Sequence, residues 1–549
     1  MQLWTICKGL MLSAAIAAGS SPTLAQTDPA SIERTIPKFE ARPTEQRPAL
    51  PTRTPDAQES SRVAGRFVLG AVNIEGATVF GSEELAKSFE PYLASEVGQA
   101  ELDRIVADIT AQYRRAGYLL SYAVLPEQAA QSGIVRIQVV EGYVANVHLK
   151  GDVRASAAAS AIASRLSTEH PLRTATLERA LGLVRDIPGV VVSDTRISRS
   201  VGDPTRHELT ITLNRDRARA IAYADNRGTI EGARVRSYAS VSLPSLVIPG
   251  DQLQVDAFAI PSDEFRFFYG QAKASFPLSS SGLRLSMAAS FANQFQRVEG
   301  PNQHGNSHQF IADISYPFAE SRAFSLVGHA SLSDWKSNSK RAGALIQRDR
   351  FQVARAWLEF TRIKTTRIDG RIGISRGLDL GAATEAGDAL ASRPRGSASF
   401  TKFNLDVQMV RKLSDRVRLR LDTSAQYSTQ PLLAPQEFAL GGSRIGRAFD
   451  FNEVTGDHGV GAMVELSYRL GDIKRGPKAV ELFGYADGGG AFRKHESVGL
   501  PGEQWLADVG GGARFSVAGF TWSGEIGIPV ALSRADRGVR AFFSIVKSL

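Results

Sequence analysis

The sequence predicts an all-β membrane barrel of about sixteen antiparallel strands, preceded by two small α+β domains. Three observations support this prediction. Apolar and polar residues alternate with a period of two from residue 221 to residue 549. Residues 66–214 contain the same order of strands and helices twice. After a secretory signal, no stretch offers the roughly 18 consecutive apolar residues of a membrane helix, so a membrane-spanning chain must close a barrel.

The N-terminus has the three parts of a secretory signal peptide. Lys8 supplies a positive charge, residues 9–18 form a short apolar run, and Thr23-Leu24-Ala25 ends in small residues. We therefore predict that residues 1–25 are a signal peptide, cleaved after Ala25. A buried N-terminal helix is the alternative, and the proline-rich polar stretch that follows argues against it.

Cysteine usage and charge narrow the classes of function. The only cysteine is Cys7, so the mature chain has no disulfide, thiolate nucleophile or cysteine-based metal site. This composition suits the periplasm or the outer membrane, where stray thiols are oxidised. The formal net charge of +9 indicates either a solvated basic surface or a basic pore lumen. No nucleic-acid partner is expected behind a signal peptide.

Residues 26–65 are predicted to be a proline-rich linker. Its prolines, which prevent a long helix, are Pro29, Pro37, Pro43, Pro48, Pro51 and Pro55. One short helix is expected at residues 31–34, and the remainder is a semi-extended spacer.

The two α+β domains are predicted at residues 66–141 and 142–216. In the first domain we expect strands at 67–74, 118–125 and 134–140 and a helix at 99–115. A shorter helix, capped by Ser82, is expected to carry Leu85, Phe89 and Leu93 on one stripe. The longer helix is indicated by apolar residues at helical spacing, namely Leu102, Ile105, Val106, Ile109 and Tyr113. The second domain repeats this order, with strands at 144–149, 190–197 and 208–213 and two helices between the first two strands.

Residues 217–549 are predicted to form the barrel. Leu285, Met287 and Phe291 alternate with polar residues, and so do Leu419, Leu421 and Tyr427. A soluble antiparallel sandwich also alternates, but here Arg284, Arg418 and Arg420 lie within the strands on the polar face. The strands also reach the ten or so residues that a tilted membrane strand needs. A wet lumen lined by these arginines is therefore expected.

Four local motifs resemble those of a known family. They are Leu177 to Leu181 with the exit Asp186 to Val190, Asp225-Asn226-Arg227-Gly228 with Gly232, Gly441-Gly442 through Arg447-Ala448-Phe449, and Tyr485-Ala486-Asp487-Gly488-Gly489. Their order and spacing resemble the outer-membrane transporters of two-partner secretion (TpsB type), the ShlB/FhaC/HecB-like haemolysin secretion/activation proteins of Gram-negative bacteria. The resemblance covers most of the mature chain. It implies two periplasmic polypeptide-transport-associated (POTRA) domains, a sixteen-stranded barrel and a possible plug helix in the linker.

The resemblance also implies a site inside the barrel. A long loop folds into the lumen, and Arg447 at its tip is expected to meet Asp487 on a strand through a forked, charge-assisted contact. The residues of this expected site are Arg447, Ala448, Phe449, Tyr485, Asp487 and Gly489. An ordinary ion pair in the lumen is the alternative reading of the pair. Ala448 stands where the family usually has Gly, a residue that adopts positive φ more easily.

No catalytic, metal or cofactor site is expected. His304 and His308 have a spacing that suits a metal only on a helix, and Gly305 and Asn306 between them suggest a hairpin loop. The chain has no phosphate-binding Gly-x-x-x-x-Gly-Lys-Ser/Thr, no His-Glu-x-x-His and no Gly-x-Ser-x-Gly motif. The sequence therefore does not predict an enzyme.

The resemblance implies an outer-membrane pore that recognises an unfolded partner protein through its periplasmic domains and secretes it through the barrel. The expected partners are a large secreted adhesin or haemolysin, outer-membrane lipids, and the barrel-assembly machinery that inserts the chain. An assembly or insertion factor of the same superfamily is the alternative. A diffusion porin would leave residues 66–214 without a role, and a periplasmic enzyme would lack a site.

Overall fold

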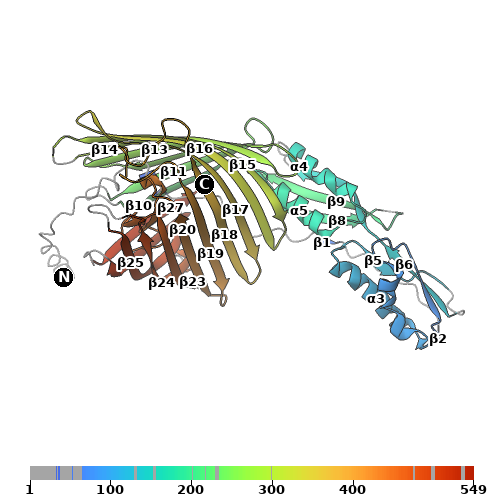
Figure 1. The fold of residues 1–549 in the computed structure, drawn as a ribbon. Coiled ribbons are helices and arrows are strands. Elements are labelled where there is room, and N and C mark those ends of the chain that lie inside the picture. The colour runs from blue at the N-terminus through green and yellow to red at the C-terminus, as the bar shows by residue number, and fades with distance from the viewer. Residues whose placement is uncertain are drawn as a thin grey trace, which may run out of the picture.

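The computed structural model describes residues 32–33, 35–36, 52–53, 65–128, 133–151, 156–200, 202–216, 218–228, 234–297, 300–473, 476–495, 501–532 and 538–549. Two small domains stand in a row beyond one end of a large barrel (Figure 1). We call this the domain end of the barrel, and the opposite one the loop end. The predicted signal peptide and most of the predicted linker lie outside these residues. No helix in the described ranges is long and apolar enough to cross a membrane.

The first domain packs two helices against a small sheet. Its elements are β2 (Phe67–Val68), β3 (Ala71–Glu75), α2 (Ser82–Ala86), η2 (Glu90–Tyr92), β4 (Glu96–Val97), α3 (Gln99–Arg115), β5 (Tyr122–Val124) and β6 (Ile134–Val140). The expected stripe of α3 is buried, because its apolar residues face the sheet β3-β6-β5. The first helix is shorter than its stripe suggested, and Gly81, not Ser82, is its N-cap.

The second domain repeats this order and contacts the barrel. It contains β7 (Tyr143–Gly151), α4 (Ser156–Ala163), η3 (Ser164–Thr168), α5 (Thr174–Arg185), β8 (Val190–Arg199) and β9 (Arg206–Arg215). Its sheet order is β1-β8-β9-β7, in which β1 (Thr52–Arg53) comes from the linker. Helix α5 lies against the barrel strand β15, where Arg185 pairs with Glu320 at 2.8 Å. The second domain therefore sits at the mouth of the barrel.

Sixteen strands form the closed antiparallel barrel, as predicted. They are β10 (Arg219–Asp225), β11 (Arg236–Pro244), β12 (Gln252–Ile260), β13 (Phe265–Pro277), β14 (Arg284–Gln296), β15 (Gln303–Glu320), β16 (Phe324–Arg341), β17 (Ala344–Ile363), β18 (Thr366–Leu378), β19 (Thr401–Lys412), β20 (Val417–Ser428), β23 (His458–Gly471), β24 (Lys478–Phe492), β25 (Glu503–Val517), β26 (Phe520–Leu532) and β27 (Arg540–Ser548). β27 closes on β10.

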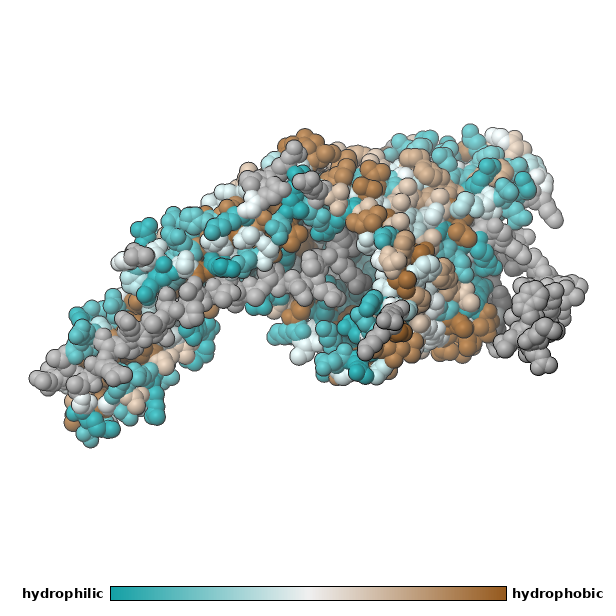
Figure 2. Space-filling model, turned by 180° about the vertical axis from the view of Figure 1, so that it is seen from behind, coloured by the Kyte–Doolittle hydropathy of each residue, from teal (hydrophilic) through white to brown (hydrophobic). Residues whose placement is uncertain are grey.

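The alternation in the barrel strands separates an apolar outer face from a polar lumen. Met287 and Phe291 on β14 are 40% and 43% exposed on the outside, while Ser290 and Gln294 between and beyond them are buried inside. Hydrophobic side chains gather over the barrel, and hydrophilic ones prevail on the two domains (Figure 2). This distribution is that of a lipid-facing band around a wet interior.

The barrel strands vary in length around the expected ten or so residues, from 7 in β10 to 20 in β17. One expectation about these strands needs correction. His304 and His308 do not lie in a hairpin loop, because β15 begins at Gln303 and pairs with both neighbouring strands over these residues. On a strand, residues four apart stand on one face about 13 Å from each other, too far to share a metal ion.

Candidate functional site

The long connection between β20 and β23 folds into the barrel. It contains η4 (Ala434–Gln436) and a two-stranded ribbon of β21 (Phe438–Leu440) and β22 (Val454–Gly456). Its apolar side chains form a cluster with the inner wall, made of Phe438, Leu440, Ile445, Phe449, Val454, Met463, Ala491 and Leu506. The loop is thus a packed part of the interior, and its tip is buried.

Glycines shape the tip of this loop. Gly441, Gly442 and Gly446 have φ values of +106°, +107° and +81°, a region that favours glycine. A Cβ on Gly441 would stand 2.0 Å from the carbonyl oxygen of Asp450. Ala448 is not among the residues with positive φ, so alanine fits where the family usually has Gly. It is fully buried against Gly527, where an added Cβ would lie 2.8 Å from that of Ala448.

Two carboxylates hold the backbone of the tip. Asp487 on β24 accepts the amide hydrogens of Gly446 at 2.7 Å and Arg447 at 3.4 Å. Asp508, its cross-strand partner on β25, accepts the amide hydrogen of Ala448 at 3.2 Å. Three successive N–H groups thus point at two acidic side chains, which fixes the position of the chain at the tip.

The Arg447 side chain does not form the expected fork on Asp487. Its guanidinium donates to Glu465 on β23 at 2.6 Å and to Glu525 on β26 at 2.5 Å, and crosses the Tyr485 ring 3.9 Å from its centre. The reason is the difference in length between the two side chains. The short Asp487 side chain lies beneath the backbone of the tip, so the long arginine extends past it to two carboxylates deeper in the lumen.

Two further arginines complete this network. Arg514 on β25 donates to both oxygens of Glu465, at 2.7 and 2.8 Å. Arg227, just after β10, contacts Glu525 and donates to the Arg447 carbonyl at 2.9 Å. Each carboxylate that binds Arg447 therefore also binds a second arginine, so neither is left with a single cation.

Four further residues of this site, Glu465, Asp508, Arg514 and Glu525, were not expected from the sequence. Their positions could have indicated a role in the lumen, because each is a charged residue in the middle of a strand, on its polar face. Gly489 was expected here, and the structure gives it a packing role. A Cβ at Gly489 would lie 2.8 Å from Leu440 of the ribbon and 2.2 Å from the Val460 carbonyl oxygen.

The other predicted lumen arginines are also bonded inside the barrel. Arg284 donates to Ser275 at 2.8 Å and to the Gly250 carbonyl at 3.0 Å. Arg420 pairs with Asp422 at 2.5 Å, and Arg418 lies 3.8 Å from Glu481. The described wall of the lumen is therefore lined by polar and charged side chains, as expected of a pore.

A second segment of the chain also lies inside the barrel. Ile32, in the stretch expected to be a short helix, is buried in a cluster of lumen side chains with Tyr238, Phe258 and Phe267. Glu33 accepts a hydrogen bond from Ser307, and Arg236 donates to the Thr35 carbonyl at 3.2 Å. Arg236 is itself paired with Asp225 and lies 4.2 Å from the Phe451 ring centre. It therefore contacts both the N-terminal segment and the long loop.

This arrangement anchors polypeptide segments inside the barrel. Among the residues that the structure describes, no group of three or more His, Cys, Asp or Glu side chains could hold a metal ion. The charged groups around the loop tip contact each other and backbone amides.

Comparisons with known proteins agree with this architecture. Residues 67–142 match the family described as POTRA domain, ShlB-type, and residues 209–515 match haemolysin secretion/activation protein ShlB/FhaC/HecB. The chain is 22% identical over 457 residues to the heme/hemopexin transporter protein HuxB of Haemophilus influenzae, which covers 80% of this chain and 79% of HuxB. It is 21% identical to the outer membrane transporter CdiB of Dickeya dadantii, over 81% and 80% of the two chains.

Solved structures show the same fold. CdiB from Escherichia coli superposes with a TM-score of 0.74 at 17% identity, over 95% of each chain. CdiB from Acinetobacter baumannii gives 0.66 at 16% identity, over 90% of this chain and 92% of that one. The second family match spans more than half of the chain. The protein is thus an outer-membrane β-barrel with periplasmic POTRA domains, and it belongs to the haemolysin secretion/activation (ShlB/FhaC/HecB) family of two-partner secretion transporters.

Proposed function

We propose that this chain recognises an unfolded partner protein in the periplasm and exports it through the barrel. The observation that carries the proposal is the position of the second domain, which stands at the mouth of a closed, polar barrel and is bound to it through Arg185 and Glu320. A diffusion pore needs no such domain. The partner is expected to be a large secreted protein of the adhesin or haemolysin type.

We further propose the following division of the chain. Residues 1–25 are the signal peptide, 26–65 the linker with a short plug helix, 66–141 and 142–216 the two POTRA domains, and 217–549 the barrel. Each domain has its own apolar cluster, although Leu120 of the first domain packs in the cluster of the second, and this supports their treatment as two units. The contacts of Ile32 and Glu33 inside the barrel support a plug.

Capture of the partner would use the edges of the domain sheets. In the first domain, β3 pairs with β6 on one side, and no strand of the described chain pairs with its other side. In the second domain, β7 pairs with β9 on one side, and its other side has no partner strand among the described residues. An extended peptide could add to either edge through backbone hydrogen bonds, which demand little of its sequence.

The anchored loop tip is proposed to be a fixed part of the export machine. Arg447 is bound to Glu465 and Glu525, and its backbone amide to Asp487. These contacts join the tip to β23, β24 and β26, so they would keep the loop on one wall and leave the rest of the lumen for the passing chain.

The test is a binding and export experiment. A soluble fragment of residues 61–216 should bind an unfolded N-terminal fragment of the exported protein, which we expect to be encoded by a neighbouring gene. The full chain, expressed with that protein, should release it into the medium. A folded fragment that binds no candidate, together with a full chain that exports none, would favour a diffusion pore. If expression of this chain instead restored the insertion of other β-barrel proteins into the outer membrane, the function of an assembly factor would be favoured.

A further inference from the structure

The outer wall of the barrel changes character near the loop end of β13 to β16. Phe268, Phe291 and Phe310 point outward and are 44%, 43% and 46% exposed. Beyond them most outward positions are polar, although Phe295 also points outward. They are occupied by Arg266, His304, His308, Lys336 and Lys340, together with Asn293, Asn306 and Asn338.

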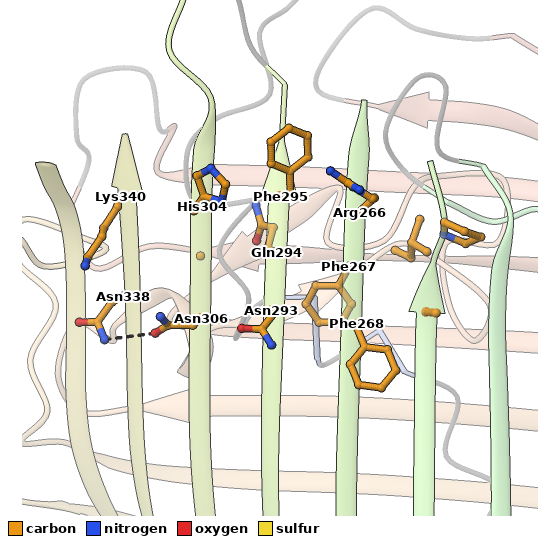
Figure 3. Close-up of a pocket in the computed structure, with 14 residues that line it drawn as sticks. Arg266, Phe267, Phe268, Asn293, Gln294, Phe295, His304, Asn306, Asn338 and Lys340 are labelled. Atoms are coloured by element: carbon orange, nitrogen blue, oxygen red, sulfur yellow. Dashed lines mark hydrogen bonds between the residues drawn. The ribbon is translucent and has the colours of Figure 1, made fainter. Parts of the chain in front are cut away.

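The strand register arranges these residues in rows that run around the barrel. Arg266 lies opposite Phe295, Phe295 opposite His304, and His304 opposite Lys340. The next row toward the membrane contains Phe268, Asn293, Asn306 and Asn338. Figure 3 shows both rows across neighbouring strands, with the basic side chains in the upper row and the amides below. They line a hollow of about 560 Å³.

The height of the hollow places it at the membrane surface. Outward aromatic residues form girdles at the interfaces of such barrels, and Phe291 belongs to this ring. Phe295, in the basic row, is four residues further along β14. Four residues span ~13 Å along a strand, or ~10 Å along the membrane normal at a tilt of ~40°. The hollow therefore lies at the depth of lipid headgroups, which begin just above the hydrocarbon.

The charges of this surface are only partly balanced by the protein. Lys336 stands opposite His308 on one side and Arg350 on the other, an arrangement of basic residues that is unfavourable when both members are charged. Asp334 lies 3.4 Å from Lys336. Within the described chain, Arg266 and Lys340 form no ion pair with a carboxylate. The Arg266 guanidinium lies instead over the Phe295 ring, 4.7 Å from its centre.

We propose that this hollow binds the phosphorylated headgroup of an outer-leaflet lipid, the glucosamine phosphates of lipopolysaccharide. Arg266 and Lys340 supply two cations at opposite ends of the basic row, and anionic headgroups bind basic pockets of this kind. An arginine fork also matches the geometry of phosphate. Asn293, Asn306 and Asn338 present amides that hydrogen-bond to sugar hydroxyls, and the exposed face of Phe268 packs beside the acyl chains.

The occupant follows from position and chemistry together. The domain end carries the periplasmic domains, so the hollow faces the outer leaflet. The surface is basic, aromatic and amide-rich, which fits a ligand that is at once a phosphate, a sugar and a lipid. The inference needs only the outer-membrane location and does not depend on export.

The test uses the full-length protein, purified in detergent and freed of lipid. Binding of bis-phosphorylated lipid A is compared with dephosphorylated lipid A and with inorganic phosphate, by native mass spectrometry. Each cation near an anionic lipid surface contributes about fivefold in affinity, so Arg266→Gln with Lys340→Gln should weaken binding of the phosphorylated form by roughly 25-fold. Arg266→Lys with Lys340→Arg should retain binding, which separates lost charge from lost folding.

A matched control lies at the other end of the same wall. Arg362→Gln with Lys364→Gln removes two exposed cations at the domain end of β17 and should leave binding unchanged. Equal binding of dephosphorylated lipid A, or unchanged binding by the Arg266 and Lys340 double variant, would overturn the proposal. Displacement of lipid A by millimolar inorganic phosphate would show a free-anion site and would also overturn it.

Discussion

Arg447 shows how one side chain can join several strands. A guanidinium presents five N–H donors in a planar fork, so a single arginine can bind two carboxylates at once, which a lysine does with poorer geometry. Here the two acceptors, Glu465 and Glu525, lie on β23 and β26, and the Tyr485 ring lies below the plane. The tip is therefore fixed by the side chain and, separately, by the backbone contacts to Asp487 and Asp508.

We predict that Arg447→Ala leaves the barrel inserted while export of the partner falls sharply. Glu465 keeps Arg514 and Glu525 keeps Arg227, so the loss is roughly 1–3 kcal/mol, less than for a carboxylate stripped of its only cation. A loss of this size is enough to release the loop from the barrel wall but not to unfold the sixteen-stranded barrel. The measurement is the amount of partner protein secreted into the medium when the variant and the unchanged transporter are present at equal levels in the outer membrane. Normal export by Arg447→Ala would contradict the proposed role in export, and the network would then be an ordinary cluster of ion pairs in the lumen.

A double-mutant cycle should separate the two anchors of the tip. Arg447→Ala and Glu465→Gln both remove the contact between Arg447 and Glu465, so their combined effect on export should be smaller than the sum of the two single effects. Arg447→Ala and Asp487→Ala remove different contacts, one to the side chain and one to backbone amides, so their combination should be clearly worse than either change alone. If Asp487→Ala instead masked the effect of Arg447→Ala, a direct pair between these two side chains would be indicated.

Glu141 should make the first domain sensitive to acid. Burial raises the pKa of Glu141, but hydrogen bonds from Thr78, Val79 and Tyr113 stabilise the carboxylate and hold its pKa below the ordinary value. A lowered folded-state pKa gives stability that is complete above the unfolded pKa, about 4.3, and is lost as the pH falls through the folded pKa.

We therefore predict that Glu141→Gln destabilises the fragment 61–216 by about 1 kcal/mol at pH 7. The difference from the unchanged fragment should shrink as the pH is lowered through 4 and below, because the native carboxyl is then protonated as well. Urea unfolding at several pH values measures this. Glu127→Gln is the control, since Glu127 is exposed. A difference that stayed constant with pH would assign the effect to packing.

At the scale of elements, helix α5 and strand β15 form the joint between the second domain and the barrel. Gly182 lets them approach, because a Cβ there would lie 2.3 Å from the Glu320 side chain. Glu320 accepts from Arg185 at 2.8 Å and from Ser325 at 2.6 Å, and its side chain is 2% exposed. Arg179 adds a bond to the Phe318 carbonyl at 3.2 Å.

We predict that Arg185→Ala loosens this joint. Glu320 would keep only the Ser325 hydroxyl as a named partner, and a buried carboxylate without its cation is costly, roughly 3–5 kcal/mol in comparable pairs. Limited proteolysis of the membrane-inserted protein should then cut between the second domain and β10 at a higher rate. Arg173→Ala, a change at an exposed arginine of the same domain (64% side-chain exposure), should leave the rate unchanged. Equal rates in all three proteins would show that the pair does not hold the joint.

The sequence predicted elements better than it predicted contacts. Helix α3 occupies the expected residues 99–115, because its apolar stripe recurs over several turns. The lipid and lumen faces of β14 and β20 follow from alternation alone. The partner of Arg447 could not be predicted, because Glu465, Asp487 and Glu525 lie on β23, β24 and β26 of the same stretch of barrel wall and all face the lumen. In the sequence these carboxylates look equivalent, and only reach and depth in the lumen distinguish them.

At the scale of the whole molecule, the lumen is occupied from two sides. One occupant is the long loop between β20 and β23, and the other is the segment around Ile32, which precedes the first domain. Arg236 contacts both, through the Thr35 carbonyl and the Phe451 ring, and its pair with Asp225 holds it to the start of the barrel. Displacement of one occupant therefore alters contacts of the other, which ties the state of the pore to both.

The last prediction concerns the conductance of the pore. Deletion of residues 26–60 should raise the single-channel conductance in planar bilayers, because it removes the segment that packs on Tyr238, Phe258 and Phe267. Ile32→Asp should act in the same direction, since Ile32 is 7% exposed and an unpaired carboxylate in that apolar cluster is strongly disfavoured. Leu93→Asp, at a position 37% exposed in the first domain, is the control and should leave conductance unchanged. If neither the deletion nor Ile32→Asp changed conductance, the segment would not obstruct ion flow, and the polar lumen beside it would have to carry the current.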